Sequence, residues 1–244
     1  MLGLILAGGY GVRLQPLIKD TPKALLEFGG KAIADHIVEK LLEIGEVSRI
    51  ILVTNERFRG DFLKWLEGRS YGRVEVVVEP GRSDREKLGA VGGLARLVGR
   101  EVREDCLVIA GDNLFTSGLG EFIEYYREKG STVTALYDVG DPEKAKQLSI
   151  AQIAADGRIL RFEEKPEKPS STLAGTGIYA FPPRSLKRIH EYLREGNNPD
   201  NPGYFIQWLC GREPVYGYVL KGKWWDIGTP ETYLEAKAYF GERQ

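Results

Sequence analysis

The chain has 244 residues, of which 42% are hydrophobic, and its 34 basic and 35 acidic side chains leave a formal net charge of −1. This composition suits a soluble protein with a substantial core, and the balanced charge argues against a nucleic-acid partner, which usually requires a basic surplus. Because no apolar run is long enough to cross a bilayer and the N-terminus lacks the basic flank of a signal peptide, we expect a cytoplasmic protein without a membrane partner.

The first half of the chain alternates short apolar runs with segments of helical periodicity. Continuous apolar runs predict buried strands, and apolar residues that recur every three or four positions predict helices packed on them. The expected strands are residues 2–6, 49–54, 74–78, 106–110 and 132–137, and the expected helices are residues 33–44, 58–67, 90–98 and 118–129. This alternation predicts an α/β fold with a Rossmann-like mixed, mostly parallel sheet and helices on both faces.

The second half begins with a strong hairpin signal, Asp156-Gly157. The expected strands are residues 150–154, 159–163, 178–181 and 215–220, and the expected helices are residues 183–193 and 230–239. Loops rich in Pro, Gly and Asn at residues 79–88 and 196–203 have the character of lids or crossings, not of domain linkers. We therefore expect a single domain over residues 1–244.

The most informative stretch of the chain reads LILAGGYGVRLQPLIKDTPK, in which an apolar run leads into glycines. This pattern predicts a buried strand that feeds a tight turn. Gly8, Gly9 and Gly11 have no Cβ, so their backbone N–H groups can approach an anion closely. Arg13 and Lys23 add the positive charge that backbone dipoles lack. The stretch is therefore a candidate polyphosphate site.

Two familiar glycine-rich motifs are excluded. The Walker loop requires Gly-Lys-Ser/Thr, whereas Gly11 is followed by Val12 and Arg13. The dinucleotide fingerprint requires a third glycine where this chain has Leu14, which argues against a nicotinamide-dependent oxidoreductase. A turn whose glycines serve geometry alone is the remaining alternative, and the cations at fixed offsets disfavour it.

Two aspartates lie close to predicted elements, one after a strand and one before a helix. Asp112, in the sequence AGDN, comes directly after a predicted buried strand, and ligands of open α/β sheets bind beyond the carboxyl ends of the strands. A capping role is the alternative for Asp112. Asp226 lies three residues before Thr229, which we expect to cap a helix that begins at Pro230. Capping therefore does not account for Asp226.

Several motifs occur together in a characteristic order. They are LAGGYGVRLQPL with TPKAL, then GDN, EEKP, GTGIYAF and WWDIGTPETY. Together they resemble the sugar-phosphate nucleotidyltransferase family, which includes glucose-1-phosphate thymidylyl- and uridylyltransferases and mannose-1-phosphate guanylyltransferases. The resemblance extends from residue 4 to residue 238, and it implies the nucleotide-diphospho-sugar transferase fold.

The resemblance implies a role for each matching residue. Arg13, Lys23 and Asp112 are the implied catalytic residues, with Arg13 on the leaving pyrophosphate and Lys23 on the reacting phosphates. Asp112 and Asp226 are the implied ligands of Mg²⁺. The implied nucleotide-binding residues are Leu6, Ala7, Gly8, Gly9, Gly11, Glu79, Gly89 and Asp112.

The implied sugar-phosphate site is formed by later residues. Lys165 would bind the phosphate, and either Glu163 or Glu164 would bind the sugar, with the spacing of the motif favouring Glu164. The family often has an Asn before the Gly-Ile-Tyr strand, where this chain reads AGTG. The corresponding sugar contact would therefore come from Thr176 or from the backbone, at Gly177, which leaves the identity of the sugar open.

The implied reaction is attack by a sugar-1-phosphate oxygen on the α-phosphorus of a nucleoside triphosphate. Its small-molecule substrates would be dTTP or UTP and glucose-1-phosphate, and its products an NDP-sugar and pyrophosphate. Because the nucleophile is already ionised near neutral pH, no general base is needed.

Two alternatives stay open at this stage. One is a mannose-1-phosphate guanylyltransferase, and the other is a non-catalytic regulatory subunit that senses sugar nucleotides. Retention of all four charged residues, Arg13, Lys23, Asp112 and Asp226, argues against the second. The C-terminal β-helix or helical extension of many relatives is not expected in this chain, and a homo-oligomer is left open.

Overall fold

The computed structural model describes residues 1–9, 14, 18, 21–80, 88–99 and 102–241. The chain divides into two compact units, each assembled from separate segments. The first unit contains residues 1–88, 109–116 and 223–244, and the second contains residues 89–108 and 117–222. Each unit has buried apolar side chains of its own. The expectation of one domain over residues 1–244 stays a prediction.

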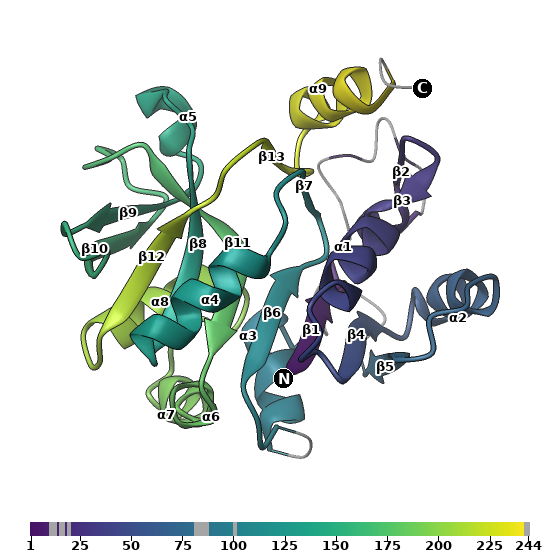
Figure 1. Cartoon of the computed structure of the whole chain (residues 1–244), viewed down its shortest axis with the longest axis horizontal. Coiled ribbons are helices and arrows are strands. Elements are labelled where there is room, and N and C mark those ends of the chain that lie inside the picture. Colours follow the sequence, from purple (N-terminus) through teal and green to yellow (C-terminus); the bar gives the residue numbers. More distant parts are fainter. Residues whose placement is uncertain (10–13, 15–17, 19–20, 81–87, 100–101, 242–244) are drawn as a thin grey trace. The chain divides into compact units, whose positions relative to one another are not determined.

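The first unit contains three parallel strands, β1 (Leu2–Leu6), β4 (Arg49–Asn55) and β5 (Val74–Glu79), in the order β1-β4-β5 (Figure 1). Strands β1 and β4 are largely buried, as their continuous apolar sequences predict. The register pairs Asn55 with Glu79 at the carboxyl end of the sheet. The expected strands therefore form, and their carboxyl ends share one edge.

Two helices follow strands of the first unit. Helix α1 (Ile33–Leu42) buries Ile37 and Leu41 on its apolar stripe and ends two residues earlier than expected. Helix α2 (Arg59–Glu67) buries Phe62. Both helices were expected from their apolar periodicity.

A buried carboxylate, Asp35, joins α1 to the segment after α2. Its oxygens accept hydrogen bonds from Arg69 Nη2 at 2.7 Å, Trp65 Nε1 at 3.0 Å and Tyr71 Oη at 3.0 Å, and from the Ala32 N–H at 3.0 Å. Burial alone would raise the pKa of Asp35, but these hydrogen bonds outweigh burial and hold the pKa below its usual value.

The first unit also contains short elements that periodicity does not reveal. They are the 3₁₀ helix η2 (Lys23–Leu25) and the strands β2 (Glu27–Phe28), β3 (Lys31–Ala32), β7 (Asn113–Phe115) and β13 (Trp224–Asp226). Two or three residues are too few to show a repeat. The final helix α9 (Pro230–Gly241) has the expected cap, because Thr229 Oγ1 accepts the N–H of Thr232 at 3.3 Å.

The second unit contains a mixed sheet in the order β10-β9-β11-β8-β12 (Figure 1). Its strands are β8 (Thr132–Asp138), β9 (Ser149–Ile153), β10 (Ile159–Glu164), β11 (Leu173–Phe181) and β12 (Val215–Val219). Only the β8–β12 pair among these is parallel. The hairpin predicted at Asp156-Gly157 is confirmed, with Gly157 at φ +83°. Strand β11 begins five residues before the expected strand, because its register shift accommodates glycines that resemble a loop.

Strand β6 (Cys106–Ala110) runs from the second unit into the first at Ile109. The helices of the second unit are α3 (Ala90–Val98), α4 (Gly120–Lys129), α5 (Pro142–Ala145), α6 (Pro183–Lys187), α7 (Ile189–Arg194) and α8 (Pro202–Cys210). The helix expected over residues 183–193 is therefore two helices. The loop expected over residues 196–203 is shorter, because Asn201 caps α8 by accepting the N–H of Gly203.

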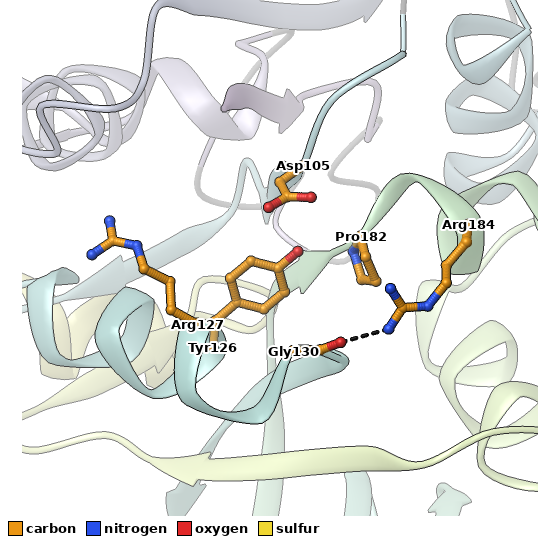
Figure 2. A pocket seen from close by; sticks show the side chains of 6 residues that line it. All are labelled: Asp105, Tyr126, Arg127, Gly130, Pro182 and Arg184. Atoms are coloured by element: carbon orange, nitrogen blue, oxygen red, sulfur yellow. Dashed lines mark hydrogen bonds between the residues drawn. The ribbon is translucent and has the colours of Figure 1, made fainter.

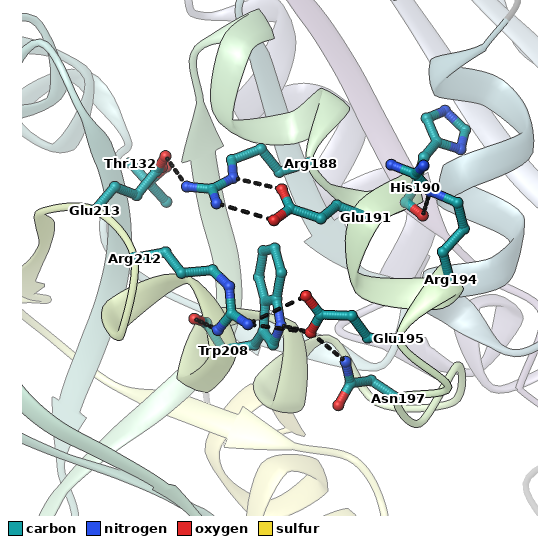
Figure 3. A network of polar contacts seen from close by, with 10 residues as sticks. All are labelled: Thr132, Arg188, His190, Glu191, Arg194, Glu195, Asn197, Trp208, Arg212 and Glu213. Atoms are coloured by element: carbon teal, nitrogen blue, oxygen red, sulfur yellow. Dashed lines mark hydrogen bonds and ion pairs between the residues drawn. The ribbon is translucent and has the colours of Figure 1, made fainter.

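A polar network surrounds Trp208 on α8 (Figure 3). The guanidinium groups of Arg188 and Arg212 lie 5.2 and 3.9 Å from the centre of the Trp208 ring. The indole N–H donates to Glu195 at 2.7 Å, and Glu195 also pairs with Arg212. The network links α7, the loop after it and the C-terminal end of α8, so its role is structural.

The expected α/β class, a mixed, mostly parallel sheet with helices, is confirmed. In the described residues, parallel pairs form the main sheet of the first unit, and antiparallel pairs predominate in the second. No helix within this part of the chain is sufficiently long and apolar to span a membrane.

Candidate active site

The glycine-rich turn begins where β1 ends at the carboxyl edge of the first unit's sheet. Ala7 N–H donates to the Val53 carbonyl at 2.8 Å, and the Asn55 amide donates to the Gly8 carbonyl at 2.9 Å. These bonds fix the start of the turn on β4. Of the residues predicted to bind phosphates, Gly11 and Arg13 lie outside the described residues.

Gly8 and Gly9 have no structural requirement for glycine among the described residues. Neither has a positive φ angle, and a Cβ built on either would have no described atom within 4 Å. A missing side chain at these positions would instead let an external group approach the backbone closely. This open space fits the prediction of a phosphate site.

Asp112 lies at the same edge because of close packing at Gly111. The Gly111 N–H donates to the Leu6 carbonyl at 2.9 Å. A Cβ at Gly111 would lie 2.9 Å from that oxygen and 3.1 Å from Ala7 Cα, so only glycine fits. The prediction that Asp112 shares an edge with the glycine turn is confirmed.

Lys23 and Asp112 form an ion pair. Lys23 Nζ lies 3.0 Å from Asp112 Oδ2, and the two side chains are 15% and 32% exposed. Lys23 opens η2 directly after Pro22, whose backbone is extended. The structure thus brings together two residues that are 89 positions apart in the sequence.

The β7–β13 ladder brings the backbone of Asp226 close to that of Asp112. Asp226 is directly opposite Asn113, and the Ile227 N–H donates to the Asp112 carbonyl at 3.0 Å. The Trp224 indole donates to Asn113 Oδ1 at 2.5 Å, which ties the two strands together through side chains. Asp112 and Asp226 are therefore one residue apart across the ladder.

Two carboxylates in this arrangement suit a hard cation. Magnesium is usually held by one or two carboxylates, with phosphate oxygens and water as its other ligands. A metal site formed by the protein alone usually needs three or more ligating side chains. The described residues contain no such group of His, Cys, Asp or Glu. The donors present fit the implied Mg²⁺.

Glu79 is the last residue of β5 and is opposite Asn55, which binds Gly8. It therefore lies at the carboxyl edge of the same sheet. Its role toward the base stays a prediction.

The predicted sugar residue Glu164 belongs to the second unit, at the end of β10. Its carboxylate accepts hydrogen bonds from Asn201 Nδ2 at 2.6 Å and from the Ser149 hydroxyl. Gly203, in the first turn of α8, has no room for a side chain, because its Cβ would lie 2.6 Å from Ser149 Oγ. Glu164 is therefore fixed by its own unit before any ligand binds.

Lys165 has an unusual backbone. Its φ angle is +46°, the one positive value among the described non-glycine residues, although it precedes Pro166. Its N–H donates to the Leu148 carbonyl at 3.1 Å. Strained conformations of this kind are found most often at functional sites, where the surrounding structure maintains them. The exposed Lys165 side chain is consistent with the predicted phosphate contact.

Thr176 and Gly177 are explained within the second unit. The buried Thr176 hydroxyl donates to the Ala135 carbonyl at 2.9 Å. Gly177 has φ +75° within the register shift of β11. Their sugar contacts stay predictions.

Gly89 also has a structural explanation. It has φ +76°, and a Cβ there would lie 2.6 Å from the Pro199 carbonyl carbon. The Val91 N–H donates to the Pro199 oxygen at 2.8 Å, which satisfies one N–H at the start of α3. The base contact predicted for Gly89 is not needed to account for this glycine.

Three residues that support the predicted site residues were not identified from the sequence, namely Asn55, Ser149 and Asn201. Asn113 belongs to the quoted GDN motif, but its bond to Trp224 was not predicted. Asn55 follows a buried apolar run, the same signal that identified Asp112. Asn201 precedes Pro202, a typical helix start. Ser149 offered no comparable signal.

The second unit also contains an open hollow of about 300 Å³ that involves none of the predicted site residues (Figure 2). Asp105, Tyr126, Arg127, Gly130, Pro182 and Arg184 line it. Burial raises the pKa of Tyr126, as does its neighbour Asp105. Arg184 donates to the Gly130 carbonyl. Since both charge signs are present, the hollow favours no ligand class.

Comparison with known proteins tests whether the chain belongs to the family that its motifs resemble. The model of the nucleotidyl transferase family matches residues 2–243. The chain belongs to this family. The recognition of a sugar-phosphate nucleotidyltransferase from the sequence motifs is confirmed.

Individual relatives resemble the chain at moderate identity. A glucose-1-phosphate adenylyltransferase of Thermomicrobium roseum is 31% identical, covering 96% of this chain and 58% of that protein. The UTP–glucose-1-phosphate uridylyltransferase AglF of Haloferax volcanii is 29% identical, covering 97% and 95%. The crystal structure of a proposed glucose-1-phosphate thymidylyltransferase from Bacillus anthracis, in complex with sucrose, has a TM-score of 0.83 at 27% identity, covering 98% and 95%.

The lengths of these relatives differ. The chain spans 54–60% of the length of several curated relatives, and 95% of the length of the Haloferax volcanii protein. Its match to the longer relatives is therefore a match to part of each.

Proposed function

We propose that the chain transfers a nucleotidyl group from a nucleoside triphosphate, dTTP or UTP, to a sugar-1-phosphate, glucose-1-phosphate. The products are an NDP-sugar and pyrophosphate. The observation that carries this proposal is the Lys23–Asp112 pair, 3.0 Å apart, beside the glycine turn at the carboxyl edge of the first unit's sheet.

The chemistry requires charge neutralisation more than proton transfer. An oxygen of the sugar phosphate attacks the α-phosphorus, and the bond from that phosphorus to the pyrophosphate oxygen breaks. Because the nucleophile is already an anion, the main obstacle is to bring two polyanions together in line. Lys23 supplies positive charge to the reacting phosphates, and the backbone at Gly8 and Gly9, which have no side chains of their own, can approach them closely.

Asp112 and Asp226 are the residues that would hold Mg²⁺. Members of this family generally use a divalent metal ion. When bound, Mg²⁺ neutralises phosphate charge and orients the phosphate oxygens. The β7–β13 ladder supports this assignment, since it places Asp226 opposite Asn113 and binds the backbone of Ile227 to that of Asp112.

The second unit would supply the sugar-phosphate residues. Lys165, exposed and held at φ +46°, would bind the phosphate. Glu164, fixed by Asn201 and Ser149, would accept hydrogen bonds from sugar hydroxyls. A carboxylate held in place before binding loses less entropy on meeting its ligand.

The base and the sugar are the finer part of the proposal. The names of the relatives differ in the base, with adenylyl, uridylyl and thymidylyl among them. We favour dTTP or UTP with glucose-1-phosphate, and a mannose-1-phosphate guanylyltransferase is the alternative enzyme. A cytoplasmic location and the absence of nucleic-acid and membrane partners stay predictions, and a homo-oligomer is left open.

The test is pyrophosphate release with Mg²⁺ over a grid of substrates. The triphosphates are dTTP, UTP, GTP, CTP and ATP, and the sugars are the 1-phosphates of glucose, galactose, mannose and N-acetylglucosamine. We expect one strongly preferred pair, with release abolished by Asp112→Ala. The matched control is Asp61→Ala, which removes an exposed carboxylate from α2 and should leave release unchanged.

Each outcome decides between candidates. A preference for GTP with mannose-1-phosphate would establish the alternative enzyme. Absence of release with every pair, while calorimetry still detects binding of a sugar nucleotide, would overturn the catalytic proposal and favour a regulatory subunit.

A further inference from the structure

The Lys23–Asp112 pair joins two residues whose proposed ligands carry opposite charge. Lys23 is proposed to meet phosphates and Asp112 a divalent cation, yet in the structure each is the other's partner, at 3.0 Å. The Lys23 ammonium donates a hydrogen bond to Asp112 Oδ2. A cation that binds this carboxylate must therefore compete with an ammonium group already in place.

The backbones of both residues are fixed. The Asp112 carbonyl accepts the Ile227 N–H at 3.0 Å, and the neighbouring Gly111 N–H is bonded to Leu6. The Lys23 carbonyl accepts the Leu26 N–H at 3.0 Å, which closes η2. The adjustable part is the flexible four-carbon stem of the lysine, so the pair can open by rotation of that side chain alone.

The electrostatics favour an exchange of partners. While the Lys23 ammonium is paired with Asp112, a divalent cation that approaches the Asp112 carboxylate would be repelled by a positive charge about one hydrogen-bond length from that carboxylate. The pair is only 15% and 32% exposed, so water and salt screen this repulsion less than at an open surface. Phosphates offer Lys23 a second anionic partner, and its departure would leave the Asp112 oxygens to the metal.

We propose that Lys23 is the resident counter-ion of Asp112, and that nucleotide phosphates draw it away and so couple metal binding to nucleotide binding. The identity of the two ligands rests on the proposed function, whereas the counter-ion role rests on the ion pair itself. Because coupling between two ligands is reciprocal, metal should strengthen nucleotide binding by the factor by which nucleotide strengthens metal binding.

The first experiment uses Mn²⁺ alone, with the free ion measured by electron paramagnetic resonance. We expect Lys23→Gln to tighten Mn²⁺ binding by about 10-fold, within the usual range of coupling between sites. Lys23→Arg keeps the charge and should bind Mn²⁺ as weakly as the natural chain. The double variant Lys23→Gln with Asp112→Asn should lose the gain, which would place the tightened site at Asp112.

The matched control is Lys31→Gln. It removes another lysine–carboxylate pair of the same unit, in which Lys31 Nζ lies 2.7 Å from Glu39 Oε1. The Lys31 side chain is 50% exposed and the Glu39 side chain 41%. We expect no change in Mn²⁺ affinity. Lys23→Met is measured in parallel, and circular dichroism confirms folding, so a misfolded glutamine variant does not remove the test.

The second experiment adds UTP and dTTP, with the Mn²⁺–nucleotide complex of free solution subtracted by a protein-free titration. We expect either nucleotide to raise Mn²⁺ affinity in the natural chain and to raise it several-fold less in Lys23→Gln. Equal Mn²⁺ affinity in Lys23→Gln and the natural chain, or weaker binding in the variant, would overturn the counter-ion role.

The two proposals can fail separately. If Lys23→Gln binds Mn²⁺ more tightly, but the natural chain releases no pyrophosphate from any substrate pair, the counter-ion role would be supported and the enzyme rejected. Release with one preferred pair, but no tightening, would support the enzyme and reject the counter-ion role.

Discussion

In the first unit, Gly8 and Gly9 have ordinary backbone angles and no described atom within 4 Å of an added Cβ, whereas in the second unit Gly89 and Gly177 have positive φ angles. The charged residues differ in the same way. Lys23 and Asp112 are held chiefly by each other, while Glu164 is bound by Asn201 and Ser149.

The difference separates two reasons for a motif residue. In the first unit, the described structure shows no packing or backbone requirement for glycine at Gly8 and Gly9, so ligand binding is the reason we propose for these two residues. In the second unit, the predicted site residues Gly89 and Glu164 also maintain the fold of their own unit. Substitutions should therefore affect activity alone in the first case, and both stability and activity in the second.

We expect the greatest change from Asp35→Ala, which serves as a structural reference within the first unit. Loss of this buried carboxylate leaves Arg69 without its charge partner, which should lower the free energy of unfolding by about 3–5 kcal/mol. Urea unfolding at pH 7 measures the loss. The folded fraction should retain its pyrophosphate release, and full stability in the variant would contradict the structural role.

The same carboxylate predicts an acid dependence. The pKa of Asp35 is lower in the folded chain than its usual value of 3.8, so the folded state binds fewer protons. Its contribution is therefore present above the unfolded pKa and is lost as pH falls through the folded pKa. The stability difference between the natural chain and Asp35→Ala should shrink below pH ~4.

The next effect concerns Asp226→Asn, which keeps the size of the side chain and removes its charge. We expect kcat/KM to fall by about 100-fold or more, roughly 3 kcal/mol of transition-state stabilisation. Because Asp226 also has an interaction within the fold, the free energy of unfolding should fall, but by less than this loss of transition-state stabilisation. Steady-state kinetics and urea unfolding measure the two quantities. A large loss of stability with unchanged kcat/KM would reverse the interpretation.

A matched pair of glycine substitutions tests the comparison directly. Gly89→Ala places a Cβ against Pro199 and forces an unfavourable φ, so we expect a loss of about 2–3 kcal/mol of stability. Gly8→Ala meets no described atom and should change stability by less than about 0.5 kcal/mol, while it raises KM for the nucleotide. Similar unfolding curves for both variants would refute the distinction.

The smallest effect is expected at Lys165. Lys165→Gly relieves the φ of +46° and should raise the free energy of unfolding by up to about 1 kcal/mol, although it removes the proposed phosphate contact and so raises KM for the sugar-1-phosphate. Lys168→Gly is the control, because Lys168 is exposed nearby and has no positive φ. A destabilised Lys165→Gly would show that the strain is not released.

Most of the long strands and helices, the family, and the shared edge of Asp112 and the glycine turn could be predicted from the amino-acid sequence alone. Repeated apolar spacing identified most elements of five residues or more, with α8 as an exception, and carboxyl ends of parallel strands meet at one edge. Thr229 as a helix cap and the hairpin at Asp156-Gly157 were also local enough to predict.

Which side chains meet became clear only from the folded chain. The pairing of Lys23 with Asp112 spans 89 positions, and the hydrogen bond from the Trp224 indole to the Asn113 side chain spans 111. No local pattern encodes such contacts, because they depend on how separate segments pack. The structure also showed that Gly89 and Thr176 serve their own unit, since close packing and a buried hydroxyl bond become visible only once their neighbours are in place.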